Sequence, residues 1–199
     1  MSTPGHAPSS TPAWLVHLRL GRVSNLPTVW TDTLAGIFLV GVTPQPGAAA
    51  WLMLALSLFY TGGMYLNDAF DQAYDKQHHP TRPIPSGRVT ADEVFALGFV
   101  QLFLGESVLA VPFWIAGVRP SWLAMTGGVV LGLLIVYYNY NHKKNPFSPL
   151  LMALCRALVY GVAAVAAADL MGRMRWSTPL GWGMAVLVCY LIGLTYVAK

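Results

Sequence analysis

NDAFDQAYDKQHHPTRPIPSGRV, residues 67–89, begins directly after an apolar run at residues 51–66. Four oxygen-bearing side chains stand near its start, at Asn67, Asp68, Asp71 and Asp75. Three of the eight acidic residues of the chain therefore fall within nine positions. A carboxylate at the edge of a membrane is unfavourable unless a cation compensates its charge. The cluster therefore predicts a cationic partner, and a divalent metal ion is the natural candidate.

The composition predicts an all-α polytopic membrane protein. Mean hydropathy is +0.53 and only 10% of the 199 residues are charged, against about 25% in soluble domains. Apolar blocks of membrane-spanning length predict six spans, at residues 27–42, 48–66, 94–117, 121–140, 149–168 and 179–198. Residues 1–13 are rich in Pro, Ser and Thr and are expected to be a disordered lead-in to a transmembrane domain at 14–199, with no removable signal peptide.

The distribution of Lys and Arg predicts the orientation. Eight of these residues fall on the side of the N-terminus and of the acidic stretch, and three fall on the other side. The positive-inside rule then places the N-terminus and the acidic stretch in the cytoplasm. The basic pI, near 9.2, reflects this topology, because no nucleic-acid-binding signature accompanies it. We expect no nucleic-acid partner.

Helical spacing predicts that the acidic cluster converges on one face. Residues three and four apart share a helix face, and the Asp residues are spaced +3 and +4. Oxygen ligands of this kind suit Mg²⁺, whose open positions accept phosphate oxygens. Basic residues expected on the same membrane side, and suited to a diphosphate, are Arg82, Arg88, Lys143 and Lys144. The alternative is a solvated acidic loop beside lysines that only anchor the topology.

Several motifs resemble one known family. NDAFDQAYD resembles the NDxxDxxxD motif of the UbiA superfamily of intramembrane prenyltransferases, and HPTRPIPSGRV resembles the segment that follows it. RLGRVSNLPTVWTDTLAG is similar to the first helix of that family, with Arg22 and Asn25 in the usual places, and residues 140–144 match its YxxxK element. NHKKNPFSPLLMALCRALVYG is most similar to a bacterial subgroup called EboC.

The resemblance implies a UbiA-like helical bundle in a bacterial plasma membrane. It implies Mg²⁺-dependent transfer of an isoprenyl group from a polyprenyl diphosphate to an aromatic or other lipophilic acceptor. The implied metal ligands are Asn67, Asp68, Asp71 and Asp75, and the implied catalytic residues are Asp68, Asp71, Tyr140 and Lys144. The expected diphosphate contacts are Arg22, Asn25, Arg82, Arg88, Lys143 and Lys144.

The chain departs from the family pattern after its acidic cluster. Family members usually have about nine spans and a second DxxxD motif, whereas the acids after Asp92 are Glu93, Glu106 and Asp169, none paired at i+4. Either the sequence is a fragment, or its subgroup lacks the second motif. This leaves open a degenerate subunit that binds lipid or a partner. A transporter is the less favoured alternative, because the acids lie at the interface and not at the midplane.

Two ionisable residues inside predicted spans have open roles. Arg156 either binds a ligand phosphate or extends its charged end to the interface. Glu106 is a functional candidate because acids inside a membrane are rare, but a protonated Glu106 paired with Ser or Thr on a neighbouring helix is the alternative.

Overall fold

The computed structural model describes residues 12–43, 45–143 and 145–197. Residues 1–11, most of the predicted lead-in, and Lys144 lie outside this part of the chain. The described residues form helices and no strand, which confirms the predicted all-α class. The elements are α1 (Ala13–Leu20), the 3₁₀ turn η1 (Val23–Asn25), α2 (Leu26–Leu39), α3 (Pro46–Phe70), α4 (Gln72–His78), α5 (Ala91–Leu109), α6 (Val111–Ile115), α7 (Trp122–Asn141), α8 (Ser148–Leu170) and α9 (Thr178–Val197).

Local sequence signals set where the long helices begin. Proline occupies the first turn of α2, α3 and α8, where its missing N–H leaves no intrahelical bond unmade. Thr90 caps α5, because its hydroxyl accepts a bond from the Glu93 N–H at 3.2 Å. Ser121 caps α7 in the same way, through the Ala124 N–H at 3.1 Å.

Five of the six predicted spans are confirmed as helices long and apolar enough to cross a membrane. The first is shorter than predicted: α2 has 14 residues and a length of about 21 Å, against about 30 Å of hydrocarbon. The third span is interrupted next to Pro112, since α5 ends at Leu109 and α6 begins at Val111.

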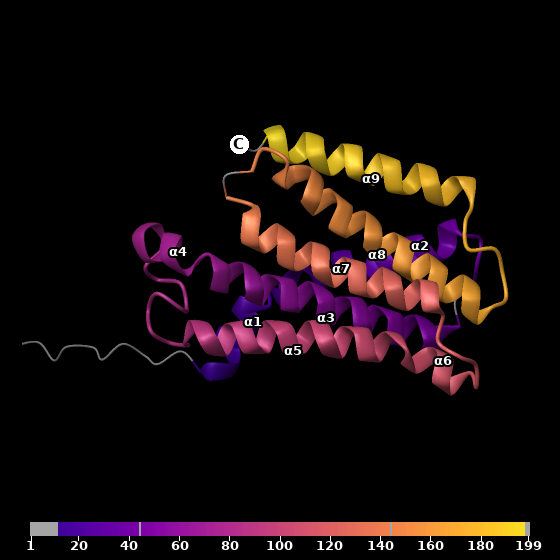
Figure 1. Ribbon diagram of the computed structural model, residues 1–199, viewed down its shortest axis with the longest axis horizontal. Helices are drawn as coiled ribbons and strands as arrows, with labels where there is room; N and C mark the ends of the chain where they lie inside the picture. Colours follow the sequence, from indigo (N-terminus) through magenta and orange to yellow (C-terminus); the bar gives the residue numbers. More distant parts are fainter. Residues whose placement is uncertain (1–11, 44, 144, 198–199) are drawn as a thin grey trace, which may run out of the picture.

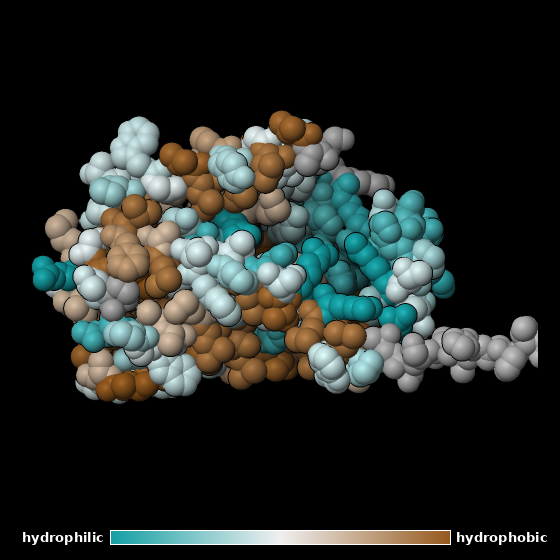
Figure 2. Space-filling view, turned by 180° about the vertical axis from the view of Figure 1, so that it is seen from behind, coloured by the Kyte–Doolittle hydropathy of each residue, from teal (hydrophilic) through white to brown (hydrophobic). Residues whose placement is uncertain are grey.

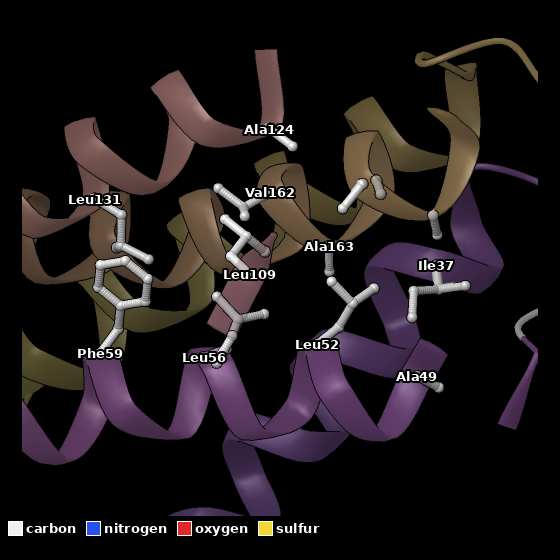
Figure 3. Close-up of a cluster of buried hydrophobic side chains, with 14 of the residues drawn as sticks. Ile37, Ala49, Leu52, Leu56, Phe59, Leu109, Ala124, Leu131, Val162 and Ala163 are labelled. Atoms are coloured by element: carbon white, nitrogen blue, oxygen red, sulfur yellow. The ribbon is translucent and has the colours of Figure 1, made fainter. Parts of the chain in front are cut away.

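The long helices lie side by side, with α4 at one end of the bundle and α6 at the other (Figure 1). Helix α3 is central and packs against α2, α5 and α7, while α8 packs against α2, α7 and α9. The core lies between them: Leu52, Leu56 and Phe59 of α3 face Leu131 of α7 and Val162 of α8 (Figure 3). We call the two ends the α4 end and the α6 end.

Glycines bring some of these helices into close contact. A Cβ on Gly36 of α2 would lie 2.4 Å from the Tyr160 carbonyl oxygen of α8, and one on Gly62 of α3 would lie 2.9 Å from the Gly98 carbonyl oxygen of α5. A Cβ on Gly128 of α7 would come closest to Glu106 Oε2 of α5. This carboxylate oxygen has no hydrogen-bond partner in the described part of the chain. Gly62 and Gly128 thus allow the close packing of helices that small residues permit in membrane proteins.

Apolar side chains cover much of the outer surface. Phe103 of α5, Leu133 of α7 and Val186 of α9 are 73%, 65% and 64% exposed. Side chains of this kind are stable on the outside only when hydrocarbon or another apolar surface covers them. Together with the five long apolar helices, they define an integral, multi-pass membrane protein.

Candidate active site

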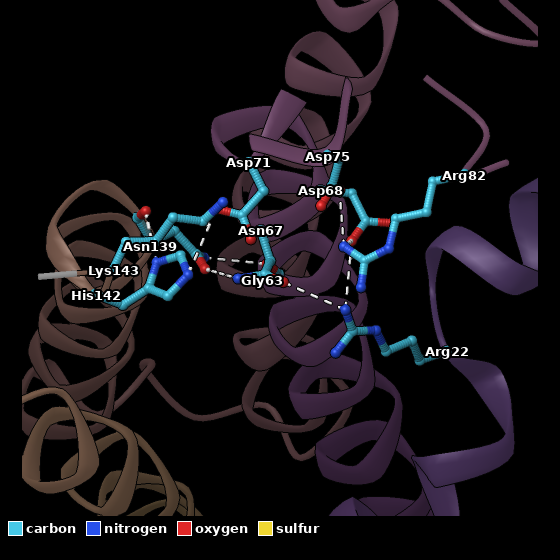
Figure 4. A network of polar contacts seen from close by, with 10 residues as sticks. All are labelled: Arg22, Gly63, Asn67, Asp68, Asp71, Asp75, Arg82, Asn139, His142 and Lys143. Atoms are coloured by element: carbon cyan, nitrogen blue, oxygen red, sulfur yellow. Dashed lines mark hydrogen bonds and ion pairs between the residues drawn. The ribbon is translucent and has the colours of Figure 1, made fainter. Parts of the chain in front are cut away.

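The acidic cluster lies at the α4 end, where segments distant in sequence meet (Figure 4). It occupies the last turn of α3 and the start of α4. The turn between α1 and η1 supplies Arg22, the loop after α4 supplies Arg82, and the end of α7 supplies Asn139, His142 and Lys143. The lysine and arginine segments that were predicted to share a membrane side thus share one end of the bundle.

The near-continuous helix of α3 and α4 keeps the predicted spacing. Helix α3 ends at Phe70 and α4 resumes at Gln72, and the Asp71 N–H still bonds the Asn67 carbonyl at 3.0 Å. The Asp75 N–H in turn bonds the Asp71 carbonyl at 2.9 Å. Asp68, Asp71 and Asp75 are all buried, at 8%, 8% and 2% exposure. Three buried carboxylates in so short a segment require cationic partners.

Asp75 is paired with Arg82. The chain turns back after α4, so that Arg82 Nη1 reaches Asp75 Oδ2 at 2.7 Å and lies 3.9 Å from Asp68 Oδ1. Partial burial alone would lower the pKa of Arg82, but the hydrogen bond and charge of Asp75 raise it above its usual value. Asp75 Oδ1 is buried and has no hydrogen-bond partner in the described part of the chain. One acceptor of the cluster is therefore left for another donor or cation.

Arg22 joins the start of the chain to the end of α3. Its Nη2 donates to Asn67 Oδ1 and to Asp68 Oδ1, both at 3.3 Å. Within residues 12–43, 45–143 and 145–197, Arg22 is the one non-glycine residue with a positive φ, at 45°. This left-handed conformation is unfavourable for a side chain of this size, and strained backbone of this kind often accompanies functional sites. The strained turn points the guanidinium toward the oxygens of α3.

Asp71 is held by the end of α7. Lys143 Nζ lies 2.9 Å and His142 Nε2 lies 3.4 Å from Asp71 Oδ1, and Lys143 Nζ also lies 3.6 Å from the centre of the Tyr74 ring. Burial would raise the pKa of Asp71, but hydrogen bonds from His142 and Lys143 outweigh it and hold that pKa below its usual value. The hydrogen bond to Asp71 raises the pKa of His142 above its usual value, against the effect of burial.

Two residues of this network, Asn139 and His142, were not predicted from the sequence. Asn67 Nδ2 donates to Asn139 Oδ1 at 3.1 Å, and Asn139 Nδ2 donates to the Gly63 carbonyl at 3.1 Å. Asn139 therefore ties α7 to α3, and it orients the Asn67 amide so that its oxygen faces Arg22. His142, the second missed residue, directly precedes the predicted lysines, so its place in the sequence was a usable signal.

Seven of the predicted site residues are brought together: Arg22, Asn67, Asp68, Asp71, Asp75, Arg82 and Lys143. Three others are not. Asn25 and Arg88 are exposed, and neither side chain forms an ion pair or hydrogen bond with the acids within the described residues. Tyr140 is 76% exposed and meets Phe70 edge-on, with ring centres 6.1 Å apart. Lys144 lies outside the described residues.

A cavity of ≈ 240 Å³ leads from this network into the bundle. Arg22 and Asn139 line it, and it continues between apolar side chains of α3, α7 and α8, among them Phe59, Leu131 and Val159. On the surface, hydrophilic residues gather toward the α4 end and surround a recess (Figure 2). This geometry accommodates a molecule whose polar head lies at the acidic cluster and whose apolar tail lies in the cavity.

The donor chemistry of the cluster fits a hard divalent cation. Three carboxylates and a carboxamide supply oxygens only, and the buried, unpaired Asp75 Oδ1 marks a position for a positive charge. Within the described residues, however, no three His, Cys, Asp or Glu side chains converge as a ready-made metal site. The carboxylates instead face Arg22, Arg82 and Lys143. Metal binding therefore requires small side-chain rearrangements in which these cations release carboxylate oxygens.

Fold and site together define a polytopic helical membrane protein with an acid-rich site above an apolar cavity. The sequence profile of the UbiA prenyltransferase family matches residues 29–198. The chain belongs to this family. The resemblance that the motifs indicated is thereby confirmed at the level of the family, and the EboC-like subgroup stays a prediction.

Curated relatives include proteins named digeranylgeranylglyceryl phosphate synthase. The one from Ignicoccus hospitalis is 31% identical over 153 residues, which cover 75% of this chain and 47% of the relative. The one from Pyrococcus horikoshii is 30% identical over 151 residues, covering 71% and 52%. The chain thus spans about half the length of these relatives. Both named organisms are archaea, and the predicted bacterial plasma membrane is not tested by this similarity.

Two solved structures have the same fold. The first, described as "Structural and mechanistic insights into the biosynthesis of Digeranylgeranylglyceryl phosphate synthase in membranes", has a TM-score of 0.71 at 19% identity, covering 90% of this chain and 58% of its own. The second, a UbiA homolog from Aeropyrum pernix K1 without ligand, has a TM-score of 0.65 at 16% identity, covering 92% and 62%. At these identities the similarity supports the fold alone.

Proposed function

We propose that this chain takes part in Mg²⁺-dependent transfer of an isoprenyl group from a polyprenyl diphosphate to a lipophilic acceptor within the membrane. The observation that carries the proposal is the buried cluster of three carboxylates and its basic partners at the mouth of an apolar cavity. A diphosphate with an isoprenyl tail has the same division into a highly charged head and an apolar chain. Membership in the UbiA prenyltransferase family supports this function.

In this proposal the acids and Asn67 bind Mg²⁺, and the basic residues bind the diphosphate. Asn67, Asp68, Asp71 and Asp75 would hold Mg²⁺, which when bound neutralises charge on the diphosphate. Arg22, Arg82 and Lys143 each contact a carboxylate, so the oxygens of a bound diphosphate would lie within reach of the same donors. Charge-assisted bonds of this kind stabilise the negative charge that the leaving diphosphate gains.

The remaining predicted residues have more distant roles in this proposal. Lys144 follows Lys143 in the sequence, and in this proposal it supplies a second positive charge to the diphosphate. Asn25 and Arg88 lie on exposed segments near Arg22 and Arg82, and they act on the diphosphate through charge and polarity at the mouth of the site. Tyr140 orients the diphosphate only if its ring leaves Phe70, against which it now packs.

The acceptor is proposed from the relatives. Their names contain a glyceryl phosphate with two geranylgeranyl groups, so the corresponding acceptor would be a glyceryl phosphate lipid with one such group. The site is proposed to face the cytoplasm, because most Lys and Arg residues share the α4 end with it. Isoprenyl diphosphates would then enter from the aqueous side while the acceptor arrives through the membrane.

Binding of a non-reactive isoprenyl thiodiphosphate to the 199-residue chain in lipid nanodiscs tests this proposal. We expect binding to require Mg²⁺, and Asp68→Ala and Asp71→Ala to weaken it about 100-fold or more, since loss of even an indirect metal contact weakens binding 10- to 100-fold. Asp169→Ala is the matched control, because it removes an ion-paired acid at the α6 end. Equal affinity with and without Mg²⁺, or in the two cluster variants, would contradict the proposal.

One observation favours a second candidate, a UbiA-like subunit that binds lipid without catalysis. Each carboxylate of the cluster already has a basic partner, and no three acids converge within the described residues. For such a subunit, the thiodiphosphate would bind through Arg22 and Arg82 without a metal. The Mg²⁺ titration described above therefore separates the two candidates.

A further inference from the structure

A second ion pair lies inside the bundle, away from the acidic cluster. Arg156 Nη1 of α8 donates to Asp32 Oδ2 of α2, and Arg156 Nη2 donates to Thr28 Oγ1 at 3.4 Å. Asp32 is six residues beyond the start of α2, which is about 9 Å along the helix axis. Arg156 therefore points to an acid on a neighbouring helix.

The packing of α2 on α8 fixes this pair. One turn beyond Asp32 and Arg156, Gly36 lies directly against the Tyr160 backbone. The two helices therefore approach most closely next to the pair and hold its side chains opposite each other. The small residues of α8 beyond this point, such as Ala163 and Ala164, are fully buried. The seam is thus closed by apolar packing on one side of the ion pair.

The other side of the pair opens into the cavity of the candidate active site. Asp32 and Arg156 line the same ≈ 240 Å³ cavity as Arg22 and Asn139. Apolar side chains, including Val29 and Leu56, line the same cavity. A molecule in this cavity can therefore touch the ion pair.

Stability alone is a weak reason for this pair. Replacing a buried ion pair by apolar residues of similar volume is often neutral or stabilising, and ionisable groups in membrane helices commonly mark functional sites. The guanidinium has five N–H donors, and the contacts with Asp32 and Thr28 use only part of them. The Arg156 side chain is 31% exposed, so its other donors are accessible.

We propose that the Asp32–Arg156 pair recognises the polar head of the acceptor. Arg156 binds an anionic phosphate or carboxylate group, and Asp32 orients the guanidinium and accepts a bond from a neighbouring hydroxyl. This inference rests on the proposed function, because it assigns the second substrate of the same cavity. It predicts that acceptors are anionic lipids or anionic hydroxylated aromatics, and that neutral alcohols of the same shape bind poorly.

The test measures four ligands separately on the 199-residue chain in nanodiscs. The probes are an alkylglyceryl phosphate with its dephosphorylated alkylglycerol, a hydroxybenzoate, and the isoprenyl thiodiphosphate with Mg²⁺. The main variant combines Asp32→Asn with Arg156→Gln, which keeps hydrogen-bonding groups of similar size. A charge swap, Asp32→Arg with Arg156→Asp, keeps the ion pair between α2 and α8 but moves the guanidinium. Asp169→Asn with Arg175→Gln is the control pair at the α6 end.

We expect the main variant and the charge swap each to weaken binding of an anionic probe by about tenfold or more, as for loss of bonds to a charged group. Alkylglycerol and thiodiphosphate should change by less than about twofold, and the control pair should change nothing. The anionic probe that depends on Arg156 identifies the group as phosphate or carboxylate.

Two results overturn the proposal. One is wild-type affinity for both anionic probes in the main variant. The other is full recovery in the charge swap, which would make the pair a structural tie between helices. Failure of the thiodiphosphate to bind the wild-type chain would instead remove the proposed function, while Arg156-dependent binding of an anionic probe would still support this subsite.

Discussion

Both ends of the bundle hold acids in ion pairs, yet they are built differently. At the α6 end the acid is Asp169, whose Oδ2 accepts a hydrogen bond from Ser121 and whose Oδ1 accepts one from Arg175. Both carboxylate oxygens therefore have partners. At the α4 end, three carboxylates share basic residues from three other segments, and Asp75 Oδ1 is left without a partner in the described part of the chain.

The difference separates a structural tie from a candidate site. A single acid satisfied by a helix-capping serine and a nearby arginine holds the start of α7 to the end of α8 and needs no ligand. Three buried carboxylates within about two helical turns repel one another, and joining the same helices would require only one of them. The excess charge, its incomplete pairing and the adjoining cavity are what mark the α4 end for binding.

The largest expected effect comes from removing one cation at each end. Arg82→Ala leaves Asp75, at 2% exposure, with neither carboxylate oxygen bonded, and should lower the free energy of unfolding by about 3 kcal/mol. Arg175→Ala should lower it by about 1 kcal/mol or less, because Arg175 is half exposed and Ser121 still bonds Asp169. Unfolding in mixed micelles with increasing SDS measures both. Equal losses would remove the distinction between the ends.

The second-largest expected effect comes from removing side-chain hydrogen bonds that join helices at the two ends. Asn139→Leu removes the bonds from Asn139 to Asn67 and to the Gly63 carbonyl, and should cost about 2 kcal/mol because the Asn67 amide is left unpaired. Ser177→Ala, at the α6 end, removes a bond to the Leu39 carbonyl and the cap of α9, and should cost about 1 kcal/mol. The same SDS titration measures both. A larger loss at Ser177 would reverse the predicted order.

A smaller effect distinguishes the ends by pH. The raised pKa of His142 means that its contribution is complete below the ordinary value of 6.5 and is lost as pH rises through the raised value. The lowered pKa of Asp71 affects only acid conditions, because its contribution is lost as pH falls below 3.8 through the lowered value. The free energy of unfolding should therefore fall as pH rises from 6.5 through the raised pKa of His142.

His142→Asn should flatten this part of the pH profile, because Asn does not titrate. Arg175→Ala should leave the slope as in the wild-type chain, since the α6-end pair contains no histidine. The profile is measured as the free energy of unfolding at successive pH values from about 6 to 9. A slope that survives in His142→Asn would show that another group carries it.

Local spacing made much of the α4 end predictable. The i+3 and i+4 pattern correctly indicated that the three Asp residues lie on one nearly continuous helix. The predicted convergence of all three is not found within the described residues, because Asp71 faces Lys143 whereas Asp68 and Asp75 face Arg82. The contacts of α7 were predicted less well. Motif matching selected Tyr140, which is 76% exposed and meets Phe70 edge-on, whereas the structure shows Asn139 bonded to Asn67 and to the Gly63 carbonyl. Helical spacing alone does not choose between them, because both lie three or four positions before Lys143.

The sequence did not predict contacts between segments that are far apart in the chain. Asp32 and Arg156 are separated by 124 positions, and no local pattern links them. The first predicted span was also too long, because hydropathy does not register that η1 and the turn at Gly41 limit α2 to 14 residues. The glycine contacts of α2 with α8 depend on the same tertiary arrangement.

The smallest expected effect concerns Arg88, which was predicted from sequence to contact the diphosphate. Its side chain is exposed and forms no ion pair with the acids within the described residues, so it acts on a ligand through solvent. Charges in this position are worth about 0.5 kcal/mol, and Arg88→Gln should therefore weaken thiodiphosphate binding about twofold.

Arg82→Gln is the matched variant, and it should weaken binding at least about tenfold, because Arg82 lies between Asp68 and Asp75. Isothermal titration in nanodiscs at two salt concentrations separates them, since the Arg88 effect should vanish at high salt. A tenfold, salt-resistant loss in Arg88→Gln would mean that the loop after α4 moves Arg88 onto the ligand, and the boundary of the site would then extend beyond the seven residues that the structure brings together.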